Sequence, residues 1–131
     1  MNFPNGGRIF ANRPEPCSVD FLITAAADVG GGGGAGVDYV VTGSGGGLIT
    51  GCTRTAEGDM KIALSDPLAG FLGLRMITTR ANSHLTMDNI TNIAAVSDPH
   101  IDVTFVATGT DTDPDGATMY FILDFYRTTT T

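Results

Sequence analysis

The sequence lacks the features that mark several common classes of protein. It has no tryptophan, only two cysteines, and seven lysine and arginine residues against fourteen acidic ones. Two cysteines, Cys17 and Cys52, supply neither a disulfide framework nor zinc-ligand spacing, so we expect buried free thiols. Nucleic-acid binding needs clustered basic residues, whereas those here are scattered along a chain with a formal net charge of -7. We therefore expect no nucleic-acid partner.

Long hydrophobic runs and an export signal are also missing. The N-terminus, "MNFPNGGRIFANRPEP", has no basic run followed by an apolar core, and no small-residue cleavage site. The longest apolar run, "FLITAAA" at residues 21–27, is far shorter than the roughly 20 residues that cross a bilayer. We expect a protein made in a cytoplasm, with no membrane partner.

Short alternating segments predict an all-β fold. Helical periodicity sustained over ten residues is absent, and the chain of 131 residues fits one domain. Residues 65–73 predict a turn with room for one helical turn. The segments that we expect to be strands are residues 19–25, 37–42, 48–55, 59–64, 74–80, 85–87, 101–107 and 119–125. Their regular spacing predicts a single-domain antiparallel β-sandwich or jelly-roll-like barrel over residues 19–131.

The first eighteen residues have a different character. Three of the six prolines, Pro4, Pro14 and Pro16, lie there. Proline removes a backbone donor and biases the residue before it toward extended conformations. We therefore expect residues 1–18 to form an extended N-terminal arm that needs a surface to lie against.

The last predicted strand is apolar on both faces. Met119, Phe121, Leu123 and Phe125 alternate along one face, while Tyr120, Ile122 and Tyr126 accompany Asp124 on the other. One core requires only one apolar face. The pattern therefore indicates either a central strand of the sandwich or a contact between subunits.

The segment "DTDPDG" at residues 111–116 begins like an EF-hand calcium loop. The twelfth position of such a loop carries a bidentate glutamate, but counting from Asp111 places Ile122 there. Asp-Pro-Asp-Gly is also strong turn chemistry, in which Asp115 caps the turn and Gly116 takes a positive φ. We favour a hairpin turn. The alternative is weak calcium binding, whose ligands would be Asp111, Asp113 and Asp115.

Other titratable groups do not form a convincing catalytic set. Asp98, His100 and Asp102 are spaced to share one face of a strand, where they could bind a divalent metal, but a solvated strand face is favoured. Ser83 and His84 are adjacent, so their side chains point apart on a strand. We expect a protein without catalytic residues, cofactor or metal.

Two segments resemble a type of small tailed-phage virion protein. They are "GCTRTAEGDMKIALSDP" and "VSDPHIDVTFVATGTDTDPDGATMYFILDFYR", and the resemblance covers roughly residues 48–127. Several members look like capsid decoration, or cement, proteins, which sit as β-rich oligomers on the outside of the head. The resemblance implies a non-enzymatic virion protein on the capsid exterior, whose partners are the major capsid protein and further copies of itself, as a trimer.

This resemblance also assigns roles to particular residues. It implies that Tyr120, Ile122 and Tyr126 contribute to a threefold contact between copies. It further implies that the N-terminal arm reaches over a neighbouring capsid subunit and stabilises the head. The arm residues expected to contact the capsid are Phe3, Pro4, Arg8, Ile9, Phe10, Arg13 and Pro14.

A second class of protein fits the same pattern. Small trimeric jelly rolls also serve as receptor- or glycan-binding tips of phage fibres. In that case the loops at residues 30–36 and 108–116 would carry the binding site. Such a tip usually follows a trimerising stalk, and this chain has neither heptads nor a fibrous repeat.

Overall fold

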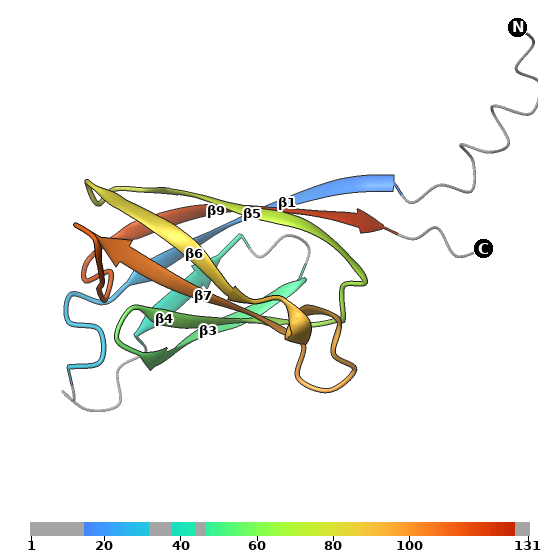
Figure 1. Cartoon of the computed structure of the whole chain (residues 1–131), viewed down its shortest axis with the longest axis horizontal. Helices are drawn as coiled ribbons and strands as arrows, with labels where there is room; N and C mark the ends of the chain where they lie inside the picture. The colour runs from blue at the N-terminus through green and yellow to red at the C-terminus, as the bar shows by residue number, and fades with distance from the viewer. Residues whose placement is uncertain (1–14, 32–37, 44–46, 128–131) are drawn as a thin grey trace, which may run out of the picture.

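Two antiparallel β-sheets pack face to face in the computed structural model, which describes residues 15–31, 38–43 and 47–127 (Figure 1). Sheet A has the order β2 (Tyr39–Thr42), β1 (Glu15–Ala25), β9 (Thr118–Arg127) and β5 (Gly70–Thr78). Sheet B has the order β3 (Ile49–Ala56), β4 (Asp59–Leu64), β7 (His100–Ala107) and β6 (Ser83–Asn89), with β8 (Thr110–Asp111) beside β7. The predicted all-β sandwich is confirmed, as two separate open sheets.

Alternation along the strands builds the core between the sheets. Every second side chain of a strand points to the same face, so the inward positions of β4 and β9 are apolar and buried. These positions are Met60, Ile62, Leu64, Met119, Phe121 and Leu123. At the centre Phe121 stacks on Phe21 of β1, with ring centroids 5.1 Å apart and an interplanar angle of 10°.

Strand β1 begins earlier than the sequence predicts. Glu15 pairs with Arg127, and the register continues without interruption to Thr24 and Thr118. The predicted strand started at residue 19, so four residues assigned to the arm belong to sheet A, because backbone pairing with β9 continues to its last residue. Residues 1–14, which include every predicted capsid-contact residue, lie outside the described residues.

Strand β5 also begins earlier than predicted. It starts at Gly70 rather than Leu74, so the helical turn expected at residues 65–73 is wrong. A register shift between Phe71 and Gly73 lets Phe71 pack against the core while the strand continues along β9. A short 3-10 helix, η1 (Thr91–Ala94), leads from β6 toward β7 and buries Ile93.

Glycine is required at the turn between β3 and β4. Gly58 has a φ of 77°, a backbone conformation that side chains disfavour. A Cβ atom there would lie 2.8 Å from the Thr112 nitrogen and 2.9 Å from the Phe105 carbonyl oxygen. The absence of a side chain therefore lets the loop after β8 lie directly on this turn.

We predict that Phe121→Ala lowers the free energy of unfolding by about 3–5 kcal/mol, because it removes a fully buried ring and leaves a cavity. Urea denaturation measures this change. The control is Val96→Ala, since Val96 is 94 % exposed; it should change stability by less than about 0.5 kcal/mol. Equal effects of the two substitutions would contradict the core described above.

Candidate functional site

The second apolar face of β9 lies on the outside of the sandwich. Since β9 pairs with β1 on one side and β5 on the other, it is a central strand of sheet A. Tyr120 and Ile122 are half-buried and Tyr126 is 42 % exposed. No described element covers this outer face of sheet A. The strand is therefore central and also carries an open apolar face.

Neighbouring strands extend this face. Leu22 and Ile77 flank Tyr120 in adjacent strands, because Leu22 pairs with Tyr120 and Tyr120 pairs with Ile77. Large apolar side chains are exposed on all four strands of the sheet: Leu22 (36 %), Val40 (53 %), Leu72 (49 %), Ile77 (67 %) and Tyr126 (42 %). Ile122 lies between Asp20 and Arg75 of the adjacent strands, so charged groups interrupt the apolar side chains. Exposed apolar side chains that gather on one face mark interaction surfaces in soluble proteins.

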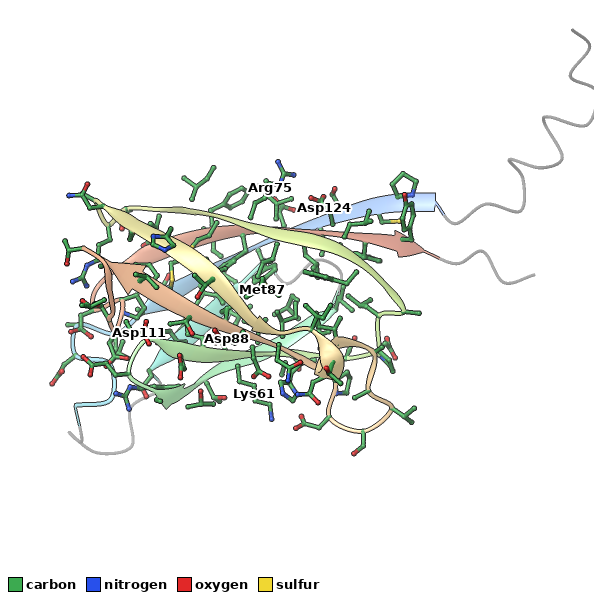
Figure 2. All side chains as sticks on the ribbon, in the orientation of Figure 1. Lys61, Arg75, Met87, Asp88, Asp111 and Asp124 are labelled. Carbon is green, nitrogen blue, oxygen red and sulfur yellow. The ribbon has the colours of Figure 1, made fainter. Side chains whose placement is uncertain are left out.

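Polar groups on the outer face of sheet A are paired within the chain. The Tyr120 hydroxyl donates to Asp20 Oδ2 at 2.8 Å, and this hydrogen bond raises the pKa of Tyr120. Arg75 Nε lies 3.4 Å from Asp124 Oδ2, and Figure 2 shows both side chains on the outer side of the sheet. Ser18 Oγ donates to the other Asp124 oxygen. A partner could therefore cover the apolar groups while Arg75 and Asp124 stay paired with each other and Asp20 keeps the hydrogen bond from Tyr120.

The outer face of sheet B is polar and acidic. The buried Thr104 hydroxyl lies 2.7 Å from Asp59 Oδ1 and 2.5 Å from Asp88 Oδ2. Asp88 and Lys61 are labelled in Figure 2, with Lys61 on the outer side of this sheet. The two outer faces of the sandwich thus differ in character: that of sheet A carries exposed apolar side chains among a few paired polar groups, and that of sheet B is polar and charged.

The Asp98, His100 and Asp102 set forms a local ion-pair cluster with Lys61. Lys61 Nζ donates to Asp98 Oδ2 at 2.6 Å, which lowers the pKa of Asp98. The Asp98 carbonyl oxygen accepts from the His100 Nδ1–H at 2.7 Å, and Nε2 lies 3.3 Å from Asp102 Oδ2. The predicted solvated strand face is correct only in part, because Asp98 lies before β7 and is exposed, whereas the His100 side chain is only 14 % exposed. Among the described residues, no three metal-ligating side chains converge.

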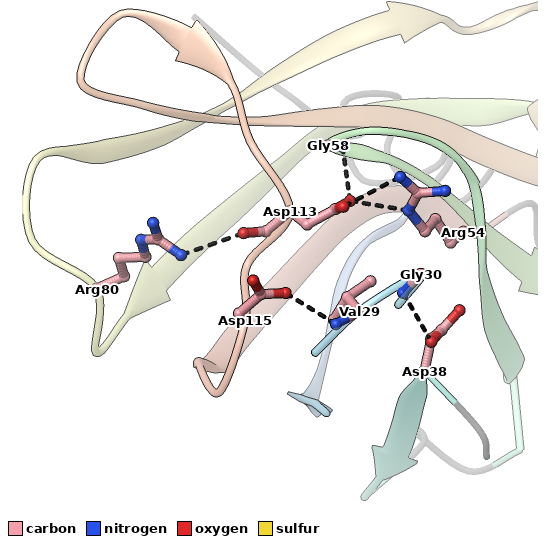
Figure 3. Close-up of polar contacts among 8 residues, drawn as sticks. All are labelled: Val29, Gly30, Asp38, Arg54, Gly58, Arg80, Asp113 and Asp115. Carbon is pink, nitrogen blue, oxygen red and sulfur yellow. Dashed lines mark hydrogen bonds and ion pairs between the residues drawn. The ribbon is translucent and has the colours of Figure 1, made fainter. Parts of the chain in front are cut away.

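The "DTDPDG" segment forms a turn that connects several loops (Figure 3). The Ala117 N–H donates to the Pro114 carbonyl at 2.9 Å, and Gly116 inside this turn has a φ of 67°, so a turn forms here as predicted. The hairpin is wrong, because β7 and β9 belong to different sheets and the segment crosses from sheet B to sheet A. Asp115 does not cap its own turn as predicted. Its carboxylate instead accepts from the Val29 N–H at 2.8 Å, because the loop after β1 lies against it.

Asp113 is the centre of these contacts. Arg54 donates to both of its carboxylate oxygens, at 3.0 and 3.1 Å, and the Gly58 N–H donates to Oδ1 at 2.9 Å. The hydrogen bond to Asp113 raises the pKa of Arg54. On the other side Arg80 donates to the Asp113 carbonyl oxygen at 3.1 Å. One residue therefore connects the β3–β4 turn, the β5–β6 turn and the loop after β8.

The cysteines do not form a reactive site. Cys52 is buried, and burial raises the pKa of its thiol to about 12, so it stays protonated and weakly nucleophilic. Cys17 is half-buried in β1. The sequence prediction of a buried free thiol is confirmed for Cys52, and Cys17 keeps partial exposure.

Comparison with protein-family models, with curated proteins and with solved structures finds no match to this chain. Within the described residues, no helix has the length and apolar character that crossing a membrane requires. The function of this chain therefore has to be inferred from its own geometry. Its distinctive surface feature is the apolar outer face of sheet A, which contains all three residues predicted to make contacts between copies.

We predict that Asp113→Asn lowers the urea midpoint of unfolding, because the amide loses the ion pair with Arg54 and half of its acceptor capacity. The matched control is Asp111→Asn, since Asp111 is exposed in the same loop. That control should leave the midpoint nearly unchanged. A midpoint equally insensitive to both changes would contradict the central position of Asp113.

We also predict that calcium does not change the thermal midpoint. The Asp113 and Asp115 carboxylates accept hydrogen bonds from different partners, Arg54 with Gly58 and Val29 respectively. A ligand that bound only the folded state would raise the midpoint in proportion to its occupancy. Differential scanning fluorimetry with calcium and with chelator provides the test, and a chelator-reversible rise would establish the calcium site.

Proposed function

We propose that this chain is a non-enzymatic capsid decoration protein, which binds the outer surface of a phage head as a homo-oligomer and stabilises it. The outer face of sheet A is the surface that we assign to this assembly. Tyr120 and Ile122 lie on its central strand β9, and Tyr126 lies near the end of that strand, beside Pro16 and Gly70. The major capsid protein is the partner, and the virion exterior is the location.

The observation that carries the proposal is the contrast between the two outer faces. Sheet A presents exposed apolar side chains, among which Arg75 and Asp124 pair with each other and Asp20 accepts from Tyr120. Apolar groups beside internally bonded polar groups suit a surface that a partner covers. Sheet B presents carboxylates and Lys61, which favour solvent. A protein that coats a particle needs one surface for attachment and another that keeps the coated particle soluble. The two sheets provide these two surfaces.

The fibre-tip alternative receives less support from the loops. A glycan-binding loop needs polar groups that are available to a ligand. In residues 108–116 the Asp113 and Asp115 carboxylates instead hold Arg54, Gly58 and Val29 in place. Residues 32–36 of the other candidate loop lie outside the described residues. These loops therefore favour a structural role, and the attachment role falls to the sheet face.

Co-sedimentation with purified phage heads that lack a decoration protein tests the proposal. We predict saturable binding of the unmodified chain, and at least about tenfold weaker binding of Ile122→Glu, because a carboxylate at the centre of the face must be desolvated. The matched control, Val96→Glu, adds the same charge at a residue outside sheet A and should bind normally.

Thermal unfolding of both variants confirms that they are folded before the comparison is made. Absence of binding by the unmodified chain would overturn the proposed function. Equal binding by the two variants would show that another surface of the protein makes the contact.

A further inference from the structure

The edge strand β5 is the least protected edge of the sandwich. Natural edge strands avoid pairing with other chains through short length, bulges or charged residues. Strand β2 has four residues, β3 has register shifts at both ends, and β6 is a polar strand with a shift near its end. Strand β5 has nine residues, and its only register shift lies near its start, between Phe71 and Gly73.

The backbone groups on the open side of β5 can be assigned from its pairing with β9. Thr79 N–H donates to the Thr118 carbonyl at 3.1 Å, so it points toward β9. Successive residues of a strand direct their backbone groups to opposite sides. Leu74, Met76 and Thr78 therefore direct their N–H and C=O groups away from β9. Since β5 pairs only with β9 among the described strands, these groups form an open ladder.

Charge favours the approach of another copy at this edge. The chain has a net charge of -7, yet residues 67–87 contain two arginines, Arg75 and Arg80, and no acidic residue. A contact between two acidic surfaces costs free energy, and this segment contributes no acidic residue to a contact. At β5 the Arg75 charge is compensated by Asp124 within its own subunit.

We propose that β5 of one copy pairs antiparallel with β5 of a second copy across a two-fold axis at Met76. Because the strand meets itself, the outward donors and acceptors of the two copies are complementary. This register places Arg75 opposite Ile77 of the partner subunit and avoids an arginine facing an arginine. The aliphatic part of Arg75 then covers the exposed Ile77 side chain.

The pairing specifies how copies of the chain associate in the proposed function. It rests on that proposed function, which requires the copies to associate. It joins two four-stranded sheets into one continuous sheet. Tyr120, Ile122 and Tyr126 of both copies then lie on a single surface that faces the head, in place of the contact between copies that the sequence resemblance implies for them. A two-fold contact gives an even number of copies, in place of the trimer that the sequence resemblance implies.

Multi-angle light scattering of matched variants tests this pairing. Ile77→Lys places a charge on β5, while Val40→Lys makes the same change on β2, at the opposite edge of the same face; both valine and isoleucine are exposed, by 53 % and 67 %. We expect dimers of the unmodified chain and of Val40→Lys. Ile77→Lys should associate at least about tenfold more weakly. Its thermal midpoint should match that of the unmodified chain at dilutions where both are monomeric.

Hydrogen exchange identifies the groups involved. In the dimer the amides of Leu74, Met76 and Thr78 should exchange more slowly than in the Ile77→Lys monomer, while the amides of β2 should not change. A trimer, a protein still monomeric at about 1 mM, or dimers unaffected by Ile77→Lys would overturn the pairing. So would dimers in which the three β5 amides stay unprotected.

Measuring head binding together with the oligomeric state distinguishes a failure of the β5 pairing from a failure of the proposed function. Dimers that require Ile77 but do not bind heads would support the pairing and overturn the decoration role. A chain that binds heads as an oligomer that Ile77→Lys does not weaken would support the decoration role and overturn the pairing.

Discussion

The continuous pairing of β1 with β9 is the constraint on which the rest of the structure depends. It joins the first and last described strands of the chain over ten residue pairs and places β9 at the centre of sheet A. One face of β9 then packs Phe121 against Phe21 in the core, and the other face must point away from it. The exposure of Tyr126 and its neighbours is a direct consequence. An apolar central strand in an open sheet leaves an apolar surface that only another molecule can cover.

Asp113 has the corresponding role at one end of the sandwich. Sheets A and B share no paired strand, so the loops between them need contacts of their own. The carboxylate of Asp113 holds Arg54 and Gly58, and its carbonyl oxygen holds Arg80. A ligand-binding site needs polar groups that are available to the ligand, whereas these polar groups bind one another. Asp124 on the outer face of sheet A is bound within the chain in the same way, because it contacts both Arg75 and Ser18. The polar groups in both places stabilise the fold, so the surface that remains for a partner is formed by the exposed apolar side chains of sheet A.

Much of this fold could be predicted from the sequence, because the two-residue period of β4, β7 and β9 is visible in their side chains. Gly58 and Gly116 were also recognisable from their turns, and both have positive φ. The start of β5 was not predictable, since a bulge between Phe71 and Gly73 interrupts the alternation. The contact between Arg54 and Asp113 was hidden for another reason: the two residues are 59 positions apart. The exposure of the second apolar face of β9 could not be predicted, because it depends on how the two sheets pack. The sequence pattern fits both a central strand and a contact between subunits.

Hydroxyl-radical footprinting of the free and assembled protein tests the central claim most directly, namely that assembly covers the outer face of sheet A and leaves that of sheet B in solvent. Tyr126 and Ile77 report on sheet A, and the exposed His84 reports on β6 of sheet B. The account predicts that oxidation of Tyr126 and Ile77 falls on assembly, while oxidation of His84 is unchanged. Protection of His84 with undiminished oxidation of Tyr126 and Ile77 would contradict it.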